Sequence, residues 1–79
     1  MSTVMWFKID AELSDEEVAR TLGSDLSIEN GAGSKQLRLI RGGGETIGCR
    51  TSDNVLKVFL SKPQFVDVAK RRWKVAGTS

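Results

Sequence analysis

The sequence predicts a single small α+β domain over residues 1–79, an antiparallel meander of four to five strands with two helices packed on one face. The 79 residues are the length of one domain with a thin core. Residues 36–60 hold three short runs of alternating apolar and basic side chains, separated by turn residues, as an antiparallel meander requires. An amphipathic segment lies on either side of this stretch, and these segments begin near Ser14 and Pro63.

The first predicted strand covers residues 4–9. Its side chains alternate between two sets that are both largely apolar. We therefore expect the strand to lie away from the sheet edge, or to have its second side covered. The two sets are Met5, Phe7 and Ile9 on one face and Val4, Trp6 and Lys8 on the other.

The first predicted helix runs from Ser14 to Leu22. Ser14 and Glu17 have the spacing of a capping box, in which each side chain accepts a hydrogen bond from the other residue's backbone N–H. Gly23 supplies a stop at the C-terminal end. The acids at positions 15–17 suit the positive end of the helix dipole, an explanation that outweighs the alternative of a docking patch.

Residues 26–29 are a weak candidate for a short strand, and residues 30–35 predict a turn rich in Gly and Ser. The GAGSK run at 31–35 is not a phosphate-binding loop, because its glycine spacing is wrong and a strand, not a helix, is expected after it.

The meander is expected to form strands at residues 37–40, 47–50 and 55–60, with turns at 42–44 and 52–54. Alternation along these strands divides their side chains into two faces. We expect Leu37, Leu39, Ile47, Cys49, Leu56, Val58 and Leu60 to face the helices, and Arg38, Ile40, Thr46, Arg50, Val55, Lys57 and Phe59 to face the other way.

The last helix is predicted to begin at Pro63, since a proline in the first turn loses no backbone hydrogen bond. Arg72 falls inside its apolar arc. This residue therefore extends to reach water, pairs with a carboxylate, or marks where the helix gives way to an extended tail at residues 72–75. The apolar arc is Phe65, Val66, Val68, Ala69, Trp73 and Val75, and the outer face is Asp67, Lys70, Arg71 and Lys74.

Charge is segregated along the chain. Residues 1–34 hold seven acids and two bases, and residues 35–79 hold three acids and ten bases, so the two parts carry −5 and +7. Such segregation bears on partners and steering, not on the fold. It favours either a charged binding partner or two parts that complement each other within the domain.

The chain contains no histidine, and Cys49 is its single cysteine. The commonest general base and metal ligand is therefore missing, and one thiol makes neither an internal disulfide nor a ligand cluster. We predict no enzymatic activity, no cofactor and no metal site, and we expect Cys49 to pack toward the core without reacting. The single thiol and the lack of an export signal or long apolar run predict a soluble, cytoplasmic protein without a membrane partner.

Binding is the function that remains. The predicted basic and apolar sheet face and the basic last helix suit a macromolecular partner. We rank first an inhibitor or adaptor that docks on a protein or a protein–nucleic acid complex, second a nucleic-acid-binding domain, and third a structural subunit of an assembly. The candidate partner-binding residues are Arg38, Arg50, Lys57, Phe59, Lys70, Arg71 and Lys74.

In size and type, a compact α+β chain with these properties is similar to the small proteins with which phages and mobile elements block host machinery, anti-CRISPR proteins among them. This similarity implies an inhibitor of viral or mobile-element origin that acts by occupying a surface of its target.

Overall fold

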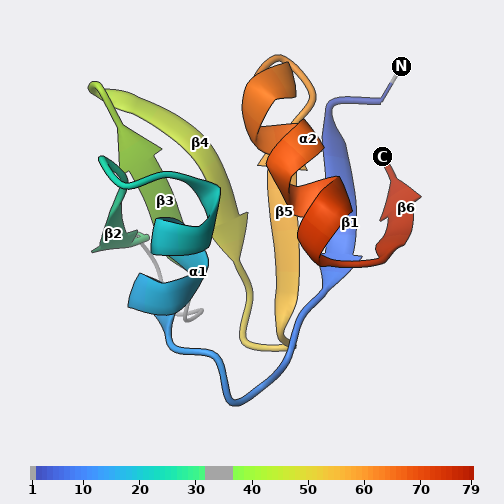
Figure 1. Ribbon diagram of the computed structural model, residues 1–79, viewed down its shortest axis with the longest axis horizontal. Coiled ribbons are helices and arrows are strands. Elements are labelled where there is room, and N and C mark those ends of the chain that lie inside the picture. Colours follow the sequence, from blue (N-terminus) through green and yellow to red (C-terminus); the bar gives the residue numbers. More distant parts are fainter. Residues whose placement is uncertain (1, 32–36) are drawn as a thin grey trace.

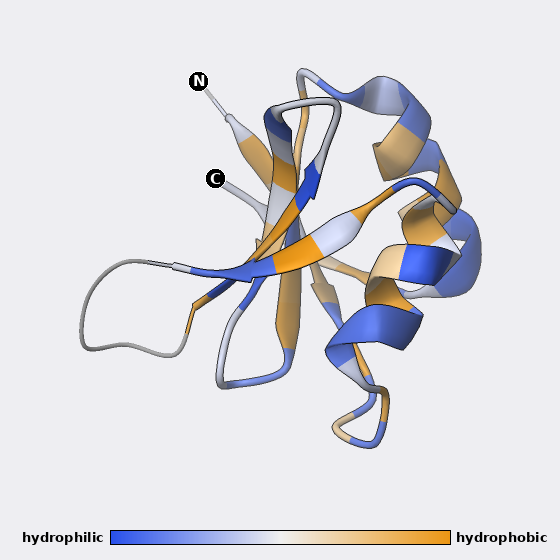
Figure 2. Ribbon diagram, turned by 90° about the vertical axis from the view of Figure 1, so that its left-hand side faces the viewer, coloured by the Kyte–Doolittle hydropathy of each residue, from blue (hydrophilic) through white to orange (hydrophobic). Residues whose placement is uncertain are grey.

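The computed structural model describes residues 2–31 and 37–79. In these residues the chain forms a six-stranded antiparallel sheet and two helices. Both helices lie on the same face of the sheet (Figure 1), and the view turned by 90° shows the two layers side by side (Figure 2). The α+β class and the antiparallel sheet are as predicted, but the sheet has six strands where four to five were expected.

The strand order across the sheet is β2-β3-β4-β5-β1-β6. The N-terminal strand thus lies inside the sheet, which is the first of the two alternatives expected from its two apolar faces. Residues 32–35 of the predicted turn lie outside the described residues. The elements are β1 (Val4–Lys8), α1 (Asp15–Leu22), β2 (Ser27–Asn30), β3 (Arg38–Gly42), β4 (Glu45–Arg50), β5 (Val55–Phe59), α2 (Pro63–Arg72) and β6 (Val75–Thr78).

Both helices begin where the local sequence signals place them. The Ser14 hydroxyl accepts a hydrogen bond from the Glu17 N–H at 3.1 Å, and the Glu17 carboxylate accepts one from the Ser14 N–H at 3.3 Å. This confirms the capping box. Pro63 is the first residue of α2, also as predicted.

The chain after α2 forms the sixth strand of the sheet. The helix ends at Arg72, Trp73 takes an extended conformation, and the chain then pairs with β1 as β6. Arg72 is exposed and marks the point where helix gives way to extended chain, which selects one of the three alternatives. Placing Val75 in the helical arc was wrong: it lies in β6 with 42% of its surface exposed. The helical spacing of apolar residues continues past Arg72 in the sequence. A longer helix, however, would leave the backbone groups along the edge of β1 without the hydrogen bonds that β6 provides.

The core lies between the sheet and the two helices. β5 and β1 contribute residues that are completely buried, and α1 and α2 cover them. Burying such side chains is the main favourable contribution to folding in a domain this small. The largest fully buried residues are Phe7, Ile40, Leu56, Val18 and Val58.

The predicted division of side chains between the two sheet faces holds for β5 and fails for β3. Residues paired across antiparallel strands share a face of the sheet. Ile40 and Val58 both pair with Gly48 and are both buried, so this face is the one that the helices cover. Arg38, expected on the far side, follows the parity of Ile40 and lies on the helix side as well. Leu37 and Leu39, expected there instead, are not among the described residues that pack against the core. Both faces of β3 carry an apolar residue, Leu39 on one and Ile40 on the other, and the alternating pattern alone led to the wrong choice of the buried face.

In β4 the alternation is broken by a bulge. Ile40 pairs with Gly48, whereas Arg41 pairs with Thr46, so Ile47 is an extra residue in β4. Ile47 therefore stays in the core while Cys49, predicted to share its face, pairs with Leu39 on the other side of the sheet. The same shift brings Arg50 to the helix side, contrary to prediction, where its neighbour across the strands is the buried Leu56.

Arg50 is 3% exposed and holds three segments together. Its guanidinium donates to the backbone carbonyls of Leu13 and Asp10, to the side-chain oxygen of Asn54 at 3.2 Å, and to the Asp15 carboxylate at 3.2 Å. The same carboxylate pairs with Arg38 at 3.0 Å. The loop after β1, the first turn of α1 and the β4–β5 turn thereby meet at one buried charge.

We expect Arg50→Ala to lower the free energy of unfolding by about 3 to 5 kcal/mol, because it removes one of the two cations that pair with the partly buried Asp15 carboxylate and leaves several buried acceptors without a donor. Urea unfolding followed by circular dichroism measures the change. Arg71→Ala, which removes an exposed arginine, serves as the control and should alter stability by less than about 0.5 kcal/mol. Equal effects of the two substitutions would show that the buried network is not a main support of the fold.

The close pairing of β4 and β5 at Gly48, next to the bulge, leads to a second prediction, about stability. A Cβ atom at Gly48 would overlap the backbone carbonyl oxygen of Lys57 in the neighbouring strand, whereas a Cβ at Gly77 meets no heavy atom within 4 Å. Gly48→Ala should therefore destabilise the protein by about 1 to 3 kcal/mol through strain between β4 and β5. Gly77→Ala is the matched control in β6. A thermal melt that is the same for both variants would contradict this account of the bulge.

Candidate functional site

The face of the sheet that the helices leave uncovered carries a compact group of apolar and aromatic side chains. Paired residues form a row across the strands, from Leu39 through Cys49 and Lys57 to Trp6. Val4 pairs with Phe59 on the same side, and Lys8 pairs with Val55. None of the apolar members is among the described residues that pack against the core. We call this surface the outer face: Val4, Trp6, Leu39, Cys49, Val55, Lys57 and Phe59.

Trp6 and Lys57 occupy the centre of the outer face. They are direct partners on β1 and β5, and the Lys57 ammonium lies 5.2 Å from the centroid of the Trp6 ring, within range of a cation–π interaction. Phe59 is the diagonal neighbour of Trp6, at the roughly 7 to 8 Å spacing that lets aromatic side chains act together. The indole Nε1 is buried and has no acceptor among the described residues. The centre of the face thus combines two aromatic rings, one cation and one unsatisfied donor.

Cys49 lies next to Lys57 on the outer face and is half-buried. Burial raises the pKa of its thiol above the usual 9.0, and the nearby Lys57 charge opposes that shift. The thiol is therefore protonated at neutral pH, so its placement on this face does not make it a nucleophile.

The seven predicted partner-binding residues do not form one surface. Lys57 and Phe59 lie on the outer face, as expected. Arg38 and Arg50 lie on the helix side and bond to Asp15. The other three are exposed: Lys70 and Arg71 lie on α2, which packs on the helix side of the sheet, and Lys74 lies just after it.

Sequence reasoning missed Trp6, Leu39 and Cys49 as members of the surface. The signal for Trp6 was present, since the first strand has a second apolar face that no predicted element covers. No comparable signal existed for Cys49, because the bulge that turns it outward depends on how β4 pairs with β3.

The opposite charges of the two chain parts are matched in part within the molecule. Among the described residues four ion pairs form, and three join the acidic part to the basic part: Arg38–Asp15 at 3.0 Å, Arg50–Asp15 at 3.2 Å and Arg41–Glu29 at 3.4 Å. The fourth is Lys62–Glu45 at 2.7 Å, and the Lys62 hydrogen bond lowers the pKa of Glu45. Four of the ten cations after residue 34 are thus taken up by carboxylates of the same chain.

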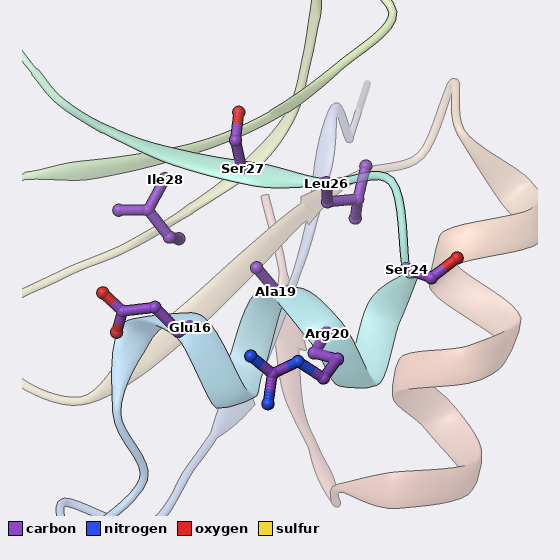
Figure 3. Close-up of a pocket in the computed structure, with 7 residues that line it drawn as sticks. All are labelled: Glu16, Ala19, Arg20, Ser24, Leu26, Ser27 and Ile28. Carbon is purple, nitrogen blue, oxygen red and sulfur yellow. The ribbon is translucent and has the colours of Figure 1, made fainter.

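A small pocket of about 180 Å³ lies between α1 and β2 (Figure 3). It is smaller than the roughly 300 to 1,000 Å³ of typical ligand sites. Glu16 and Arg20 project from α1 at its rim, and Ala19 faces the strand. The lining offers no convergent set of polar groups, so we do not place the function there. Its residues are Glu16, Ala19, Arg20, Ser24, Leu26, Ser27 and Ile28.

Within residues 2–31 and 37–79, no three His, Cys, Asp or Glu side chains come together as a set that could hold a metal ion. Neither α1 nor α2, the helices in the described part of the chain, has the length and hydropathy needed to cross a bilayer.

A scan with protein-family models finds none that matches this chain, and searches of curated proteins and of solved structures likewise find no match.

The position of Cys49 makes a prediction about pH. Because the pKa of its thiol is raised in the folded state, labelling of the native protein by a maleimide should be slow at pH 7 and should accelerate only as the pH rises beyond the usual thiol range. The same shift means that stability is fully present below the unfolded pKa and is lost as pH rises through the folded pKa.

Lys57→Gln tests the cause of this shift. Removing the charge that lowers the thiol pKa should move the midpoint of the labelling profile to higher pH. Lys62→Gln, which removes a lysine paired elsewhere, should leave the midpoint unchanged. Fast labelling of the native protein at pH 7 would contradict the protonated thiol.

Proposed function

We propose that this chain is a small non-catalytic binding protein that docks on a protein partner through the outer face and acts as an inhibitor or adaptor. The observation that carries the proposal is the uncovered side of the sheet, where Trp6, Phe59 and Leu39 stand among the described residues without a covering element. The helices cover the other side only (Figure 2).

The composition of the face fits a protein interface. Tryptophan and other aromatic residues supply most of the binding energy at such interfaces when they enter pockets of the partner. The molecule measures 27 × 26 × 26 Å, so one whole face is close to the roughly 800 Å² that each protein contributes to a standard interface.

The charges of the face define the partner's chemistry. Lys57 lies at the centre and Lys8 at one end, while Glu29 is matched by Arg41 on the same side of the sheet. The unmatched charge is positive. We therefore propose a partner surface that is apolar at its centre and acidic at its edge.

A single-stranded nucleic acid is the alternative occupant, since bases stack on aromatic side chains beside basic residues. The position of Lys57 favours the protein. Its ammonium lies over the Trp6 ring, where a base would have to stack, and within the described outer face only Phe59 provides a second aromatic platform.

The test starts with capture of partners from a nuclease-treated lysate of the cells in which the protein occurs, followed by affinity measurement with the purified partner. Trp6→Ala and Phe59→Ala should each weaken binding by about 30-fold or more, the loss expected for interface residues worth at least about 2 kcal/mol. Val75→Ala removes an exposed apolar side chain outside the outer face and should leave the affinity unchanged.

The native Cys49 provides a second measurement that needs no substitution at an aromatic residue. A bulky maleimide attached to Cys49 at raised pH should block docking, and Cys49→Ser treated in the same way should still bind. Unchanged affinity in both aromatic variants and in the labelled protein would refute docking through this face. Binding that disappears with nuclease treatment would assign the face to nucleic acid instead.

A further inference from the structure

The end of α2 carries a second charged surface, far from the outer face. We call it the basic ridge: Lys70, Arg71, Arg72 and Lys74. All four side chains are exposed, whereas the helix turns Val66 and Ala69 into the core and Trp73 packs against it from just beyond the last turn. Three of the ridge residues lie on α2, which packs on the side of the sheet opposite to the outer face (Figure 1), and Lys74 follows in the connection to β6.

The four ridge cations are close together in the sequence and, like Lys8, Arg20 and Lys57, have no carboxylate partner among the described residues. Arg38, Arg41, Arg50 and Lys62 are each paired with an acid, but none of the four ridge residues forms an ion pair with any described residue. No ion pair joins the described residues of α1, the acidic helix, to those of α2. The segment 63–74 has four cations and one acid, Asp67, and so carries +3.

The helix dipole accounts for only part of this charge. The C-terminal end of a helix is equivalent to about −0.5 elementary charge, so one cation is enough to offset it. The remaining positive charges lie within five consecutive residues at the end of α2 and repel each other, and a polyanion that binds there reduces the repulsion and releases its own counterions.

From these observations we infer that the basic ridge binds the phosphate backbone of double-stranded nucleic acid without reading its sequence. Arginine and lysine suit phosphate oxygens. Phe65 and Trp73, the aromatic residues of this segment, pack against the core and offer no platform for unpaired bases. Val66 and Ala69 are buried as well, so the ridge has no apolar stripe that would enter a membrane.

Duplex binding by the ridge is independent of the proposed docking of a protein partner, because the two surfaces share no residue. Together they describe an adaptor with a protein on the sheet side and a duplex on the helix side. Each half is tested by variants that leave the other surface intact.

The experiment measures fluorescence anisotropy of a labelled DNA duplex of random sequence as the protein is added at several salt concentrations. Four phosphate contacts predict a slope of about −3.6 in the logarithm of the association constant against the logarithm of salt concentration, a loss of roughly 150-fold between 50 and 200 mM. Each single change, Lys70→Gln, Arg71→Gln, Arg72→Gln or Lys74→Gln, should reduce the slope by about one.

The matched control is the double variant Lys8→Gln, Lys57→Gln, which removes two positive charges on the sheet side and should leave the slope unchanged. Trp6→Ala should also bind the duplex normally. Thermal melting of each ridge variant separates lost binding from lost folding, since exposed substitutions at the end of α2 should shift the melt little.

Three outcomes would overturn the inference. One is the absence of duplex binding at low salt. Another is an equal or smaller slope change for the ridge variants than for the control pair. The third is tighter binding to single-stranded DNA, or to vesicles containing phosphatidylserine, than to the duplex.

Discussion

The buried guanidinium of Arg50 is the interaction on which the arrangement of this structure depends. A buried charge is tolerated when it is paired and hydrogen-bonded. Here the Asp15 carboxylate and the oxygens of Leu13, Asn54 and Asp10 accept from the two terminal nitrogens of the guanidinium, while its buried Nε has no acceptor among the described residues. Asp15 also pairs with Arg38 on the adjacent strand. Because these partners come from the loop after β1, the start of α1 and the β4–β5 turn, forming the network places α1 on one face of the sheet and leaves the opposite face without a helix.

The bulge in β4 completes this division of the sheet. With Ile47 as an extra residue, β4 keeps Ile47 in the core and still brings Arg50 to the helix side, while Cys49 turns to the outer face beside Lys57. The strand β6 then pairs with β1 and makes it an interior strand, so that Trp6 lies within the sheet surface and not at its edge. The aromatic centre of the outer face is thus a result of backbone pairing as much as of residue type.

The distribution of ion pairs also differs between the parts of the fold. The basic second part of the chain is matched by acids of the first part where strands meet α1 and β2, through Arg38, Arg41 and Arg50. Among the described cations that form no ion pair are Lys57, which lies among aromatic side chains on the sheet, and the basic ridge at the end of α2. A protein interface tolerates a single cation among apolar groups, whereas several exposed cations close together favour phosphates. The outer face and the basic ridge therefore favour different classes of partner.

The sequence by itself determined the α+β class, the capping box that starts α1, the proline that starts α2 and the two apolar faces of β1, because each of these depends on neighbouring residues or on a clear period. It also placed Lys57 and Phe59 on the correct face. Only the tertiary structure decided the faces of Arg38, Arg50 and Cys49 and the existence of β6. Arg50 meets Asp15 across 35 residues of chain, and β6 depends on an open strand edge near the N-terminus. A periodic pattern shows which side chains alternate, but the face that is buried is set by partners distant in sequence.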